Sequence, residues 1–290
     1  MANLKEIRSR ISSVGSTMQI TNAMKMVSAA KLKRAQDAIV QLRPYANKLR
    51  DILQNISSTL DSSVGGELTA EREVKKVLLV ILTSNRGLAG AFNSNVVKVA
   101  NQALAHYQSQ GIDTELLTIG KKGFDLLNKQ SKVYKNASSL WDDLQYEAVA
   151  SIAEEITEQF KLGTFDEVKI IYNQFKNAAT QDVINEAFLP VQIQTDAAAE
   201  NVAAVDYIFE PSKEEIVTDL IPQTLKTQLY KAILDSNASE HGARMTAMHK
   251  ATDNAEDLQR ELRLYYNKAR QTAITNEILE IVGGAEALDA

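Results

Sequence analysis

The sequence predicts an α/β fold: a long antiparallel coiled coil of the N- and C-terminal helices plus a central α/β domain. Three observations support this. Apolar residues recur at alternating steps of three and four through the first sixty residues and again through the last eighty, and between them short apolar strands alternate with helices. Only four prolines and 6% aromatic residues occur in 290, which favours long helices over a β-rich fold.

Composition limits the class of protein. A hydrophobic content of 44% with 24% charged residues is typical of a soluble folded chain, not of a disordered or collagen-like one. The chain has no cysteine, which excludes disulfides, thiolate metal sites and a cysteine nucleophile. The longest apolar run, residues 77–82, is far shorter than the ~20 residues that span a bilayer. Residues 1–10 lack the apolar core of a signal peptide, so we expect a cytosolic chain.

Residues 1–60 predict one long helix with a single apolar seam. Fourteen of the seventeen seam positions are apolar, and such a seam needs a partner helix to cover it. Pro44 predicts a local kink. The seam positions are Leu4, Ile7, Ile11, Val14, Met18, Thr21, Lys25, Ser28, Leu32, Ala35, Ile39, Leu42, Ala46, Leu49, Leu53, Ile56 and Leu60.

Residues 210–288 supply the partner helix. Ser212 is a predicted N-cap and Glu215 completes a capping box, while Pro222 predicts a bend or short break. Residues 1–60 carry a net charge of +7 and residues 212–290 carry −4, so the two ends attract each other and favour an antiparallel pair. The predicted second seam comprises Met248, Ala251, Ala255, Leu258, Leu262, Tyr265, Ala269 and Thr272.

The central residues 74–195 predict a Rossmann-like α/β domain. Alternation of strands and helices indicates a parallel sheet, with the last two strands forming an antiparallel hairpin. Residues 195–204 read as a loop. The predicted strands are 77–84, 114–119, 133–136, 168–175 and 182–189, and the predicted helices are 94–110, 124–129 and 144–161.

The motifs of common enzymes are missing. The turn 85–90 contains two glycines but matches neither nucleotide-binding fingerprint, so we interpret it as a structural turn. His106, His241 and His249 are predicted to be solvated surface residues rather than metal ligands. The basic N-terminal face lacks interleaved aromatic residues, which argues against nucleic-acid binding. We therefore predict that the chain is not an enzyme.

Two stretches are apolar on more faces than one neighbouring helix can cover. Around residues 23–30 the seam becomes polar while the other faces are apolar, and residues 273–282 are apolar around most of the helix. A helix that is apolar all round is covered all round. We expect the end of the helix pair to lie inside a sleeve made by other chains; the alternative is that it packs on the chain's own α/β domain.

These motifs resemble, across essentially the whole chain, the gamma subunit of bacterial-type proton-translocating ATP synthase. Several independent segments occur in the order typical of that family, which makes the resemblance specific. They are residues 7–11 and 20–27, residues 83–93 (TSNRGLAGAFN), residues 238–245 (ASEHGARM), residues 267–271 (NKARQ), and the C-terminal ITNE at 274–277 with Gly284-Ala285.

The resemblance implies a central-stalk rotor subunit that is not itself catalytic and holds no cofactor. Its terminal helices would form a shaft inside a hetero-hexameric ring of alpha and beta subunits, and its α/β domain would contact the epsilon subunit and the c-subunit ring. Rotation driven by protons through the c ring would be coupled to ATP synthesis, or the reverse. The implied location is peripheral, on the cytoplasmic face of the bacterial inner membrane, with membrane contact only through the c ring.

The resemblance also implies roles for individual residues. Arg244 is expected opposite Met24 and Lys25 on the second helix. Gly15 departs from a good helix pattern, because a mid-helix glycine costs about 0.5–1 kcal/mol. The implied contacts with beta subunits are Met24, Lys25, Arg244, Arg270, Gln271, Thr275 and Glu277; the implied apolar bearing is Val282, Ala285 and Leu288; and the implied c-ring contact is Tyr207.

Two other functions stay open at this point. A nucleotide-dependent enzyme would use the α/β domain for chemistry and the helices as a dimerisation arm. A static coiled-coil scaffold would use the helices without transmitting motion.

Overall fold

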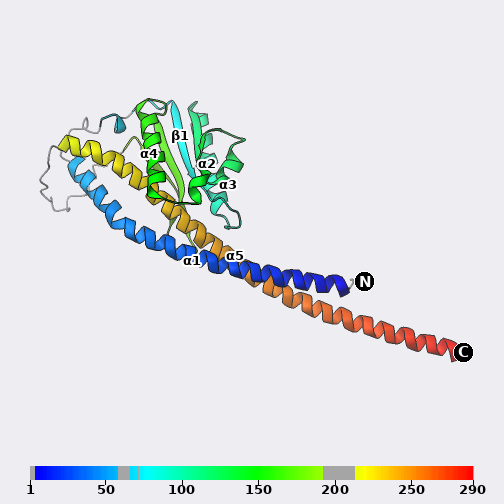
Figure 1. Ribbon diagram of the computed structural model, residues 1–290. Helices are drawn as coiled ribbons and strands as arrows, with labels where there is room; N and C mark the ends of the chain where they lie inside the picture. Colours follow the sequence, from blue (N-terminus) through cyan, green and yellow to red (C-terminus); the bar gives the residue numbers. More distant parts are fainter. Residues whose placement is uncertain (1–3, 58–65, 71, 192–212, 290) are drawn as a thin grey trace. The chain divides into compact units, whose positions relative to one another are not determined.

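The computed structural model describes residues 4–57, 66–70, 72–191 and 213–289. Two long helices carry the chain's ends: α1 spans Leu4–Ser57 and α5 spans Lys213–Asp289 (Figure 1). The predicted break at Pro222 does not occur, because the flanking Ile221 and Leu225 are buried in the core and packing holds the helix through the proline. The predicted N-cap Ser212, the loop 195–204 and Tyr207 lie outside the described residues.

The chain divides into two compact units, and both long helices contribute to each. One unit comprises Met1–Ser28 with Met245–Ala290, and the other comprises Ala29–Arg244. We call them the helix-pair unit and the central unit. The predicted division of the chain into segments 1–60, 74–195 and 210–288 stays a prediction.

The central unit contains a five-stranded sheet with strand order β3-β2-β1-β4-β5. Strands β1 to β4 pair in parallel and β5 pairs with β4 antiparallel, as predicted. The order 3-2-1-4-5 is that of doubly wound nucleotide-binding folds. The elements are β1 (Lys76–Leu82), α2 (Phe92–Ser109), β2 (Asp113–Ile119), α3 (Lys121–Leu127), β3 (Lys132–Asn136), α4 (Tyr146–Lys161), β4 (Glu167–Phe175) and β5 (Gln181–Leu189), with the short 3₁₀ helices η1 (Gly66–Leu68) and η2 (Ser138–Trp141) that the sequence did not predict.

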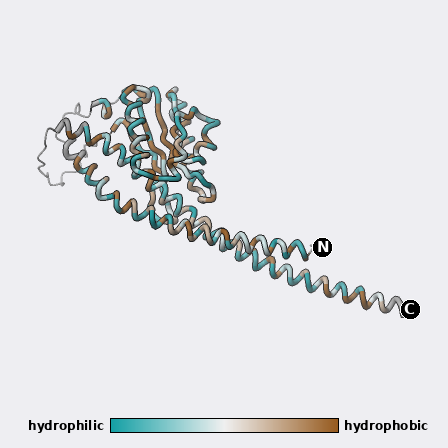
Figure 2. The backbone as a smooth tube through the Cα atoms, viewed as in Figure 1, coloured by the Kyte–Doolittle hydropathy of each residue, from teal (hydrophilic) through white to brown (hydrophobic). Residues whose placement is uncertain are grey.

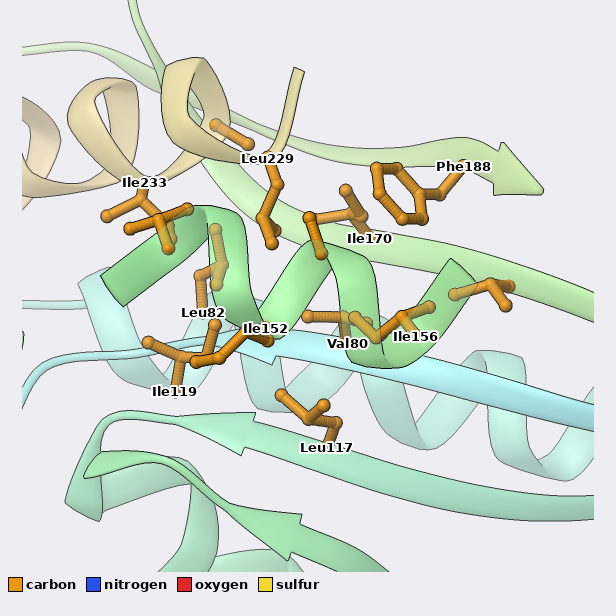
Figure 3. Close-up of a cluster of buried hydrophobic side chains, with 14 of the residues drawn as sticks. Val80, Leu82, Leu117, Ile119, Ile152, Ile156, Ile170, Phe188, Leu229 and Ile233 are labelled. Carbon is orange, nitrogen blue, oxygen red and sulfur yellow. The ribbon is translucent and has the colours of Figure 1, made fainter. Parts of the chain in front are cut away.

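Both faces of the sheet are buried, which explains the uninterrupted apolar run of β1. Val77, Leu79 and Ile81 pack with residues of α2 and α3 on one face. Val80 and Leu82 face the other side, where α4 and the first part of α5 cover the sheet. Figure 3 shows Leu229 and Ile233 of α5 in the same buried cluster as Ile152 and Ile156 of α4. Figure 2 shows how apolar residues concentrate along these strands. The start of α5 is therefore part of the domain core.

One buried carboxylate ties the central strands together. Glu115 on β2 is almost fully buried and accepts hydrogen bonds from Lys76 (2.9 Å) and Lys132. Burial by itself raises the pKa of Glu115, but the hydrogen bonds from the two lysines outweigh it and hold that pKa below its usual value.

Candidate functional site

The helix-pair unit is an antiparallel pair of α1 and α5. Arg8 Nη2 lies 3.4 Å from the Tyr266 hydroxyl, and the hydroxyls of Thr21 and Thr252 hydrogen bond at 2.9 Å. Advancing along α1 therefore moves the contact back along α5 by a similar number of residues. At this register Leu4 faces about residue 270, so α5 continues about 19 residues, roughly 28 Å, past the start of α1. Figure 1 shows the same overhang.

The α1 seam lies where the sequence predicts it. Every predicted seam position from Leu4 to Leu49 is buried or half-buried. The positions Leu53, Ile56 and Leu60 cannot be compared, since their side chains lie outside the described residues. A strict heptad period thus identified the contacting stripe of this helix, including its polar positions Thr21, Lys25 and Ser28.

The α5 seam differs from the prediction at three of its eight positions. Met248, Ala251, Ala255, Leu262 and Ala269 are buried or half-buried as predicted, but Leu258 is 46% exposed, Tyr265 is 51% exposed and Thr272 is exposed. Gln259 and Tyr266, each one residue beyond an exposed predicted position, are half-buried in place of Leu258 and Tyr265, and Thr252 is half-buried next to Ala251.

The physical reason is polar pairing across the helices. Thr252 bonds Thr21, Tyr266 meets Arg8, and the amide of Gln259 occupies the space above Gly15. A Cβ at residue 15 would lie 2.8 Å from Gln259 Nε2, so this glycine makes room for a polar side chain. The apolar Leu258 and Tyr265 are left facing outward.

The overhanging end of α5 exposes apolar and polar side chains together. Ile278 is 54% exposed and Val282 is 51% exposed, and Ile274, Leu279 and Ile281 are exposed as well. Figure 2 shows apolar segments recurring along this end of α5. The predicted site residues Arg270, Gln271, Thr275, Glu277, Val282 and Ala285 are all exposed here, and the side chain of Leu288 is outside the described residues.

A second exposed apolar surface lies on α1 in the same unit. Ile20, Met26 and Val27 are each more than half exposed, although Met24 and Lys25 beside them are half-buried. The predicted contact residues Met24 and Lys25 thus border an apolar stripe. The predicted residues Arg270, Gln271, Thr275, Glu277, Val282 and Ala285 lie apart from these two, on the overhanging end of α5.

Arg244 has a different environment. It belongs to the central unit, is buried, and donates hydrogen bonds to the Glu240 carboxylate and to the backbone carbonyl oxygens of Arg86 and Gly87, both at 3.2 Å. Glu240 also accepts a hydrogen bond from the indole N–H of Trp141. Sequence reasoning missed this cluster, because Arg86, Gly87 and Trp141 lie about 100 to 160 residues from their partners Glu240 and Arg244 along the chain.

The same contacts bear on the nucleotide-binding alternative. In doubly wound folds a ligand sits at the carboxyl edge of the sheet, where backbone N–H groups point at phosphate. Here the carbonyl oxygens of Arg86 and Gly87 point at a guanidinium, and Ser239 of α5 donates to the Asn173 carbonyl oxygen at 3.1 Å at the end of β4. This edge therefore presents hydrogen-bond acceptors, whereas a phosphate site presents donors. The donors that bind these acceptors are Arg244 and Ser239 of α5.

The histidine prediction holds for two residues and is wrong for the third. His106 and His249 are exposed, but His241 is only 9% exposed and its Nδ1 has no hydrogen-bond partner among the described residues. Burial lowers the pKa of His241 to about 4, so it is neutral at physiological pH. A single helix pattern does not reveal that this part of α5 is covered on several sides.

Among the residues that the structure describes there is no cluster of three or more histidine or acidic side chains suited to a metal ion. No helix in the described ranges has the length and apolar content needed to cross a membrane.

These features define a class of protein that combines a long antiparallel helix pair with a doubly wound α/β domain. The chain matches the ATP synthase family over residues 3–288. It is 63% identical to the ATP synthase gamma chain of Flavobacterium johnsoniae over 290 residues, with 100% of both chains covered. The chain therefore belongs to the ATP synthase gamma-chain family.

Solved structures agree with this fold. The central stalk and c-ring structure of Tetrahymena thermophila mitochondrial ATP synthase contains a chain 26% identical, with a TM-score of 0.59 over 80% of this chain and 99% of that one. A chain of the Euglena gracilis mitochondrial ATP synthase, at 20% identity, has a TM-score of 0.68 over 98% of this chain and 94% of that one.

Proposed function

We propose that this chain is the central-stalk rotor subunit of a bacterial ATP synthase. It couples proton-driven rotation of the c ring to ATP synthesis, or the reverse, at sites on the beta subunits, and it carries no catalytic site itself. Its partners are the alpha and beta subunits, the epsilon subunit and the c ring. It lies at the cytoplasmic face of the membrane and touches the membrane only through the c ring.

The exposed apolar end of α5 carries this proposal. Ile278 and Val282 lie on a helix that α1 no longer covers at that point. Burying a side chain of this size stabilises a complex by about 1.5–3 kcal/mol. Apolar contacts are also non-directional, so a helix held by them can turn within a sleeve without breaking specific hydrogen bonds. We assign Val282, Ala285 and Leu288 to this apolar bearing.

A polar band next to the apolar end suits a different task. Arg270, Gln271, Thr275 and Glu277 are exposed and can form directional contacts that differ between conformations of a partner. A rotor can drive a partner only through such differential interactions. We assign these four, with Met24, Lys25 and Arg244, to coupling with the beta subunits, and Tyr207 to the c ring.

Reconstitution with alpha, beta and epsilon subunits and the c ring tests the proposal. We expect the full chain to support proton-driven ATP synthesis. Deleting residues 274–290 should reduce it strongly while the far-ultraviolet circular dichroism of the remaining chain keeps its helical content. A static scaffold predicts unchanged synthesis after this deletion.

Charge reversal separates coupling from folding. Arg270→Glu and Lys25→Glu should each lower the ratio of synthesis to proton flow with the fold preserved. Arg260→Glu, on an exposed part of α5 where the guanidinium pairs with Glu256 and Asp257 of its own helix, is the matched control and should leave the ratio unchanged. A saturable site for a fluorescent nucleotide on the isolated chain would instead favour the enzyme alternative.

A further inference from the structure

A cavity of about 220 Å³ lies in the central unit between α1, the end of β4 and α5. Its wall carries the charged side chains of Arg43 on α1 and of Lys231 and Asp235 on α5, together with the amide side chains of Asn47 and Gln174. A water molecule needs only about 10–15 Å³ of cavity space, so a small polyatomic ion also fits. None of these residues belongs to the helix-pair unit or to the cluster around Arg244.

The carboxylate of Asp235 lacks a hydrogen-bond donor. Asp235 is only 5% exposed, and no hydrogen bond or ion pair reaches its side chain from the residues that the structure describes. Burial raises the pKa of Asp235 to about 6, although the charges of Lys231 and Arg43 act in the opposite direction. A buried acceptor without a partner is unfavourable, so a ligand that donates a hydrogen bond here would be favoured.

Two cations on the same wall lack counter-ions. Within the described ranges, the guanidinium of Arg43 and the ammonium of Lys231 form no ion pair or hydrogen bond. Lys231 lies one helical turn before Asp235, yet the two side chains do not pair. With Asp235 ionised, the wall carries two positive charges and one negative charge. It therefore favours an anion, provided that the anion can also meet a carboxylate.

We propose that this cavity binds a small oxyanion that carries a proton, and that inorganic phosphate is such an ion. Arg43 and Lys231 bind its charged oxygens, and its O–H group donates a hydrogen bond to Asp235. Sulfate has the same shape but no proton, so it would place a lone pair against the carboxylate and bind poorly. The inference does not depend on the proposed rotor function.

Titration of the full chain with phosphate and, separately, with sulfate tests the site by calorimetry, in a buffer that contains neither ion. At pH 7.5 we expect one phosphate per chain, with sulfate weaker by about tenfold or more. Arg43→Ala and Lys231→Ala should each weaken phosphate binding by about tenfold or more. Lys33→Ala is the matched control, because this exposed lysine of α1 pairs with Asp37 of its own helix, and it should leave the affinity unchanged.

The role of Asp235 has its own readout. The charged groups that act on Asp235 are Lys231 of α5, Arg43 of α1 and Glu186 of β5, and Glu186 already accepts hydrogen bonds from Tyr172 and Gln228. Lowering the pH from 7.5 to 5 should tighten sulfate binding about tenfold, because protonated Asp235 then donates to it. Asp235→Asn should bind sulfate equally at both pH values, since an amide N–H donates without titrating.

The comparison of the two ions in the wild-type chain decides the inference even if a variant does not fold. Absence of saturable phosphate binding, or equal affinity for phosphate and sulfate at pH 7.5, would overturn it. Phosphate binding that survives both Arg43→Ala and Lys231→Ala would also overturn it, because the ion would then lie elsewhere. The proposed rotor function would stand in each of these cases, since ATP-driven rotation is measured independently.

Discussion

Two buried ionisable groups of α5 make opposite contributions to the pH dependence of the free energy of unfolding over the same pH range. Asp235 is 5% exposed, and burial raises its pKa from 3.8 to about 6, with Lys231 and Arg43 offsetting only part of the cost. His241 is also buried, and burial lowers its pKa from 6.5 to about 4. Both groups are neutral in the folded chain at pH 5, whereas both are charged in the unfolded chain.

The signs of their contributions follow from proton binding. Between about pH 4 and 6 the folded chain keeps a proton on Asp235 that the unfolded chain loses, so stability falls as pH rises, by about 1.4 kcal/mol per pH unit. Over the same range the unfolded chain binds a proton at His241 that the folded chain does not, so stability rises at the same rate. Each contribution totals about 3 kcal/mol, and in the wild-type chain the two nearly cancel.

Asp235→Asn should expose the His241 contribution. We expect the free energy of unfolding of the central unit to rise by about 2 kcal/mol between pH 4.5 and 6, and to exceed the wild-type value by up to about 3 kcal/mol at pH 7. His241→Gln should give the opposite slope. The fluorescence of Trp141, the single tryptophan of the chain and buried in the same unit, follows unfolding in urea.

The control is Asp37→Asn, which removes an exposed carboxylate of α1 that pairs with Lys33 at 2.9 Å. It should leave the pH dependence of unfolding close to that of the wild-type chain. The reasoning is refuted if Asp235→Asn behaves like this control, since burial would then not govern the ionisation of Asp235.

Three further outcomes are expected. Because the chain has no cysteine, Val282→Cys places a unique thiol that should react with a maleimide in the free chain. In the assembled complex its labelling rate should fall at least tenfold, whereas Leu162→Cys should react in both states. Gly15→Ala should stabilise the chain by about 0.5 kcal/mol, since only the flexible amide of Gln259 must move. Gly242→Ala should be less favourable than Gly15→Ala by about 1 kcal/mol, because a Cβ at residue 242 meets the backbone of Ala178 at 3.2 Å. Urea midpoints of unfolding compare the two variants. Glu115→Gln should destabilise the central unit by about 1–3 kcal/mol and weaken its acid sensitivity, because a depressed carboxyl pKa contributes stability that is lost as pH falls.

The parts of the fold that follow a regular period were predictable. The α1 seam and the sheet with its antiparallel last pair follow from heptads and from strand–helix alternation. The α5 seam was misplaced because apolar content favoured Leu258 and Tyr265. The facing helix instead pairs polar side chains such as Thr21 and Arg8 with α5. A one-chain pattern of hydrophobicity does not contain that information.

The candidate site likewise has one part that the sequence predicts and another part that depends on contacts between distant segments. The apolar end of α5 is visible in the sequence because residues 273–282 are apolar on most faces. The environment of Arg244 was not visible, since its partners Arg86, Gly87 and Glu240 come together only when the sheet's carboxyl edge meets α5. The contacts of Lys25 or Arg270 with other subunits stay predictions, because they depend on surfaces that belong to other chains.

Rotation itself is the most direct test of the central claim. With the alpha and beta subunits fixed to a surface and a bead attached through the Leu162→Cys thiol, at a position exposed in this chain, single complexes can be followed by microscopy during ATP hydrolysis. The rotor account predicts that the bead turns in one direction as long as ATP is hydrolysed. Sustained hydrolysis with a bead that does not turn would contradict it.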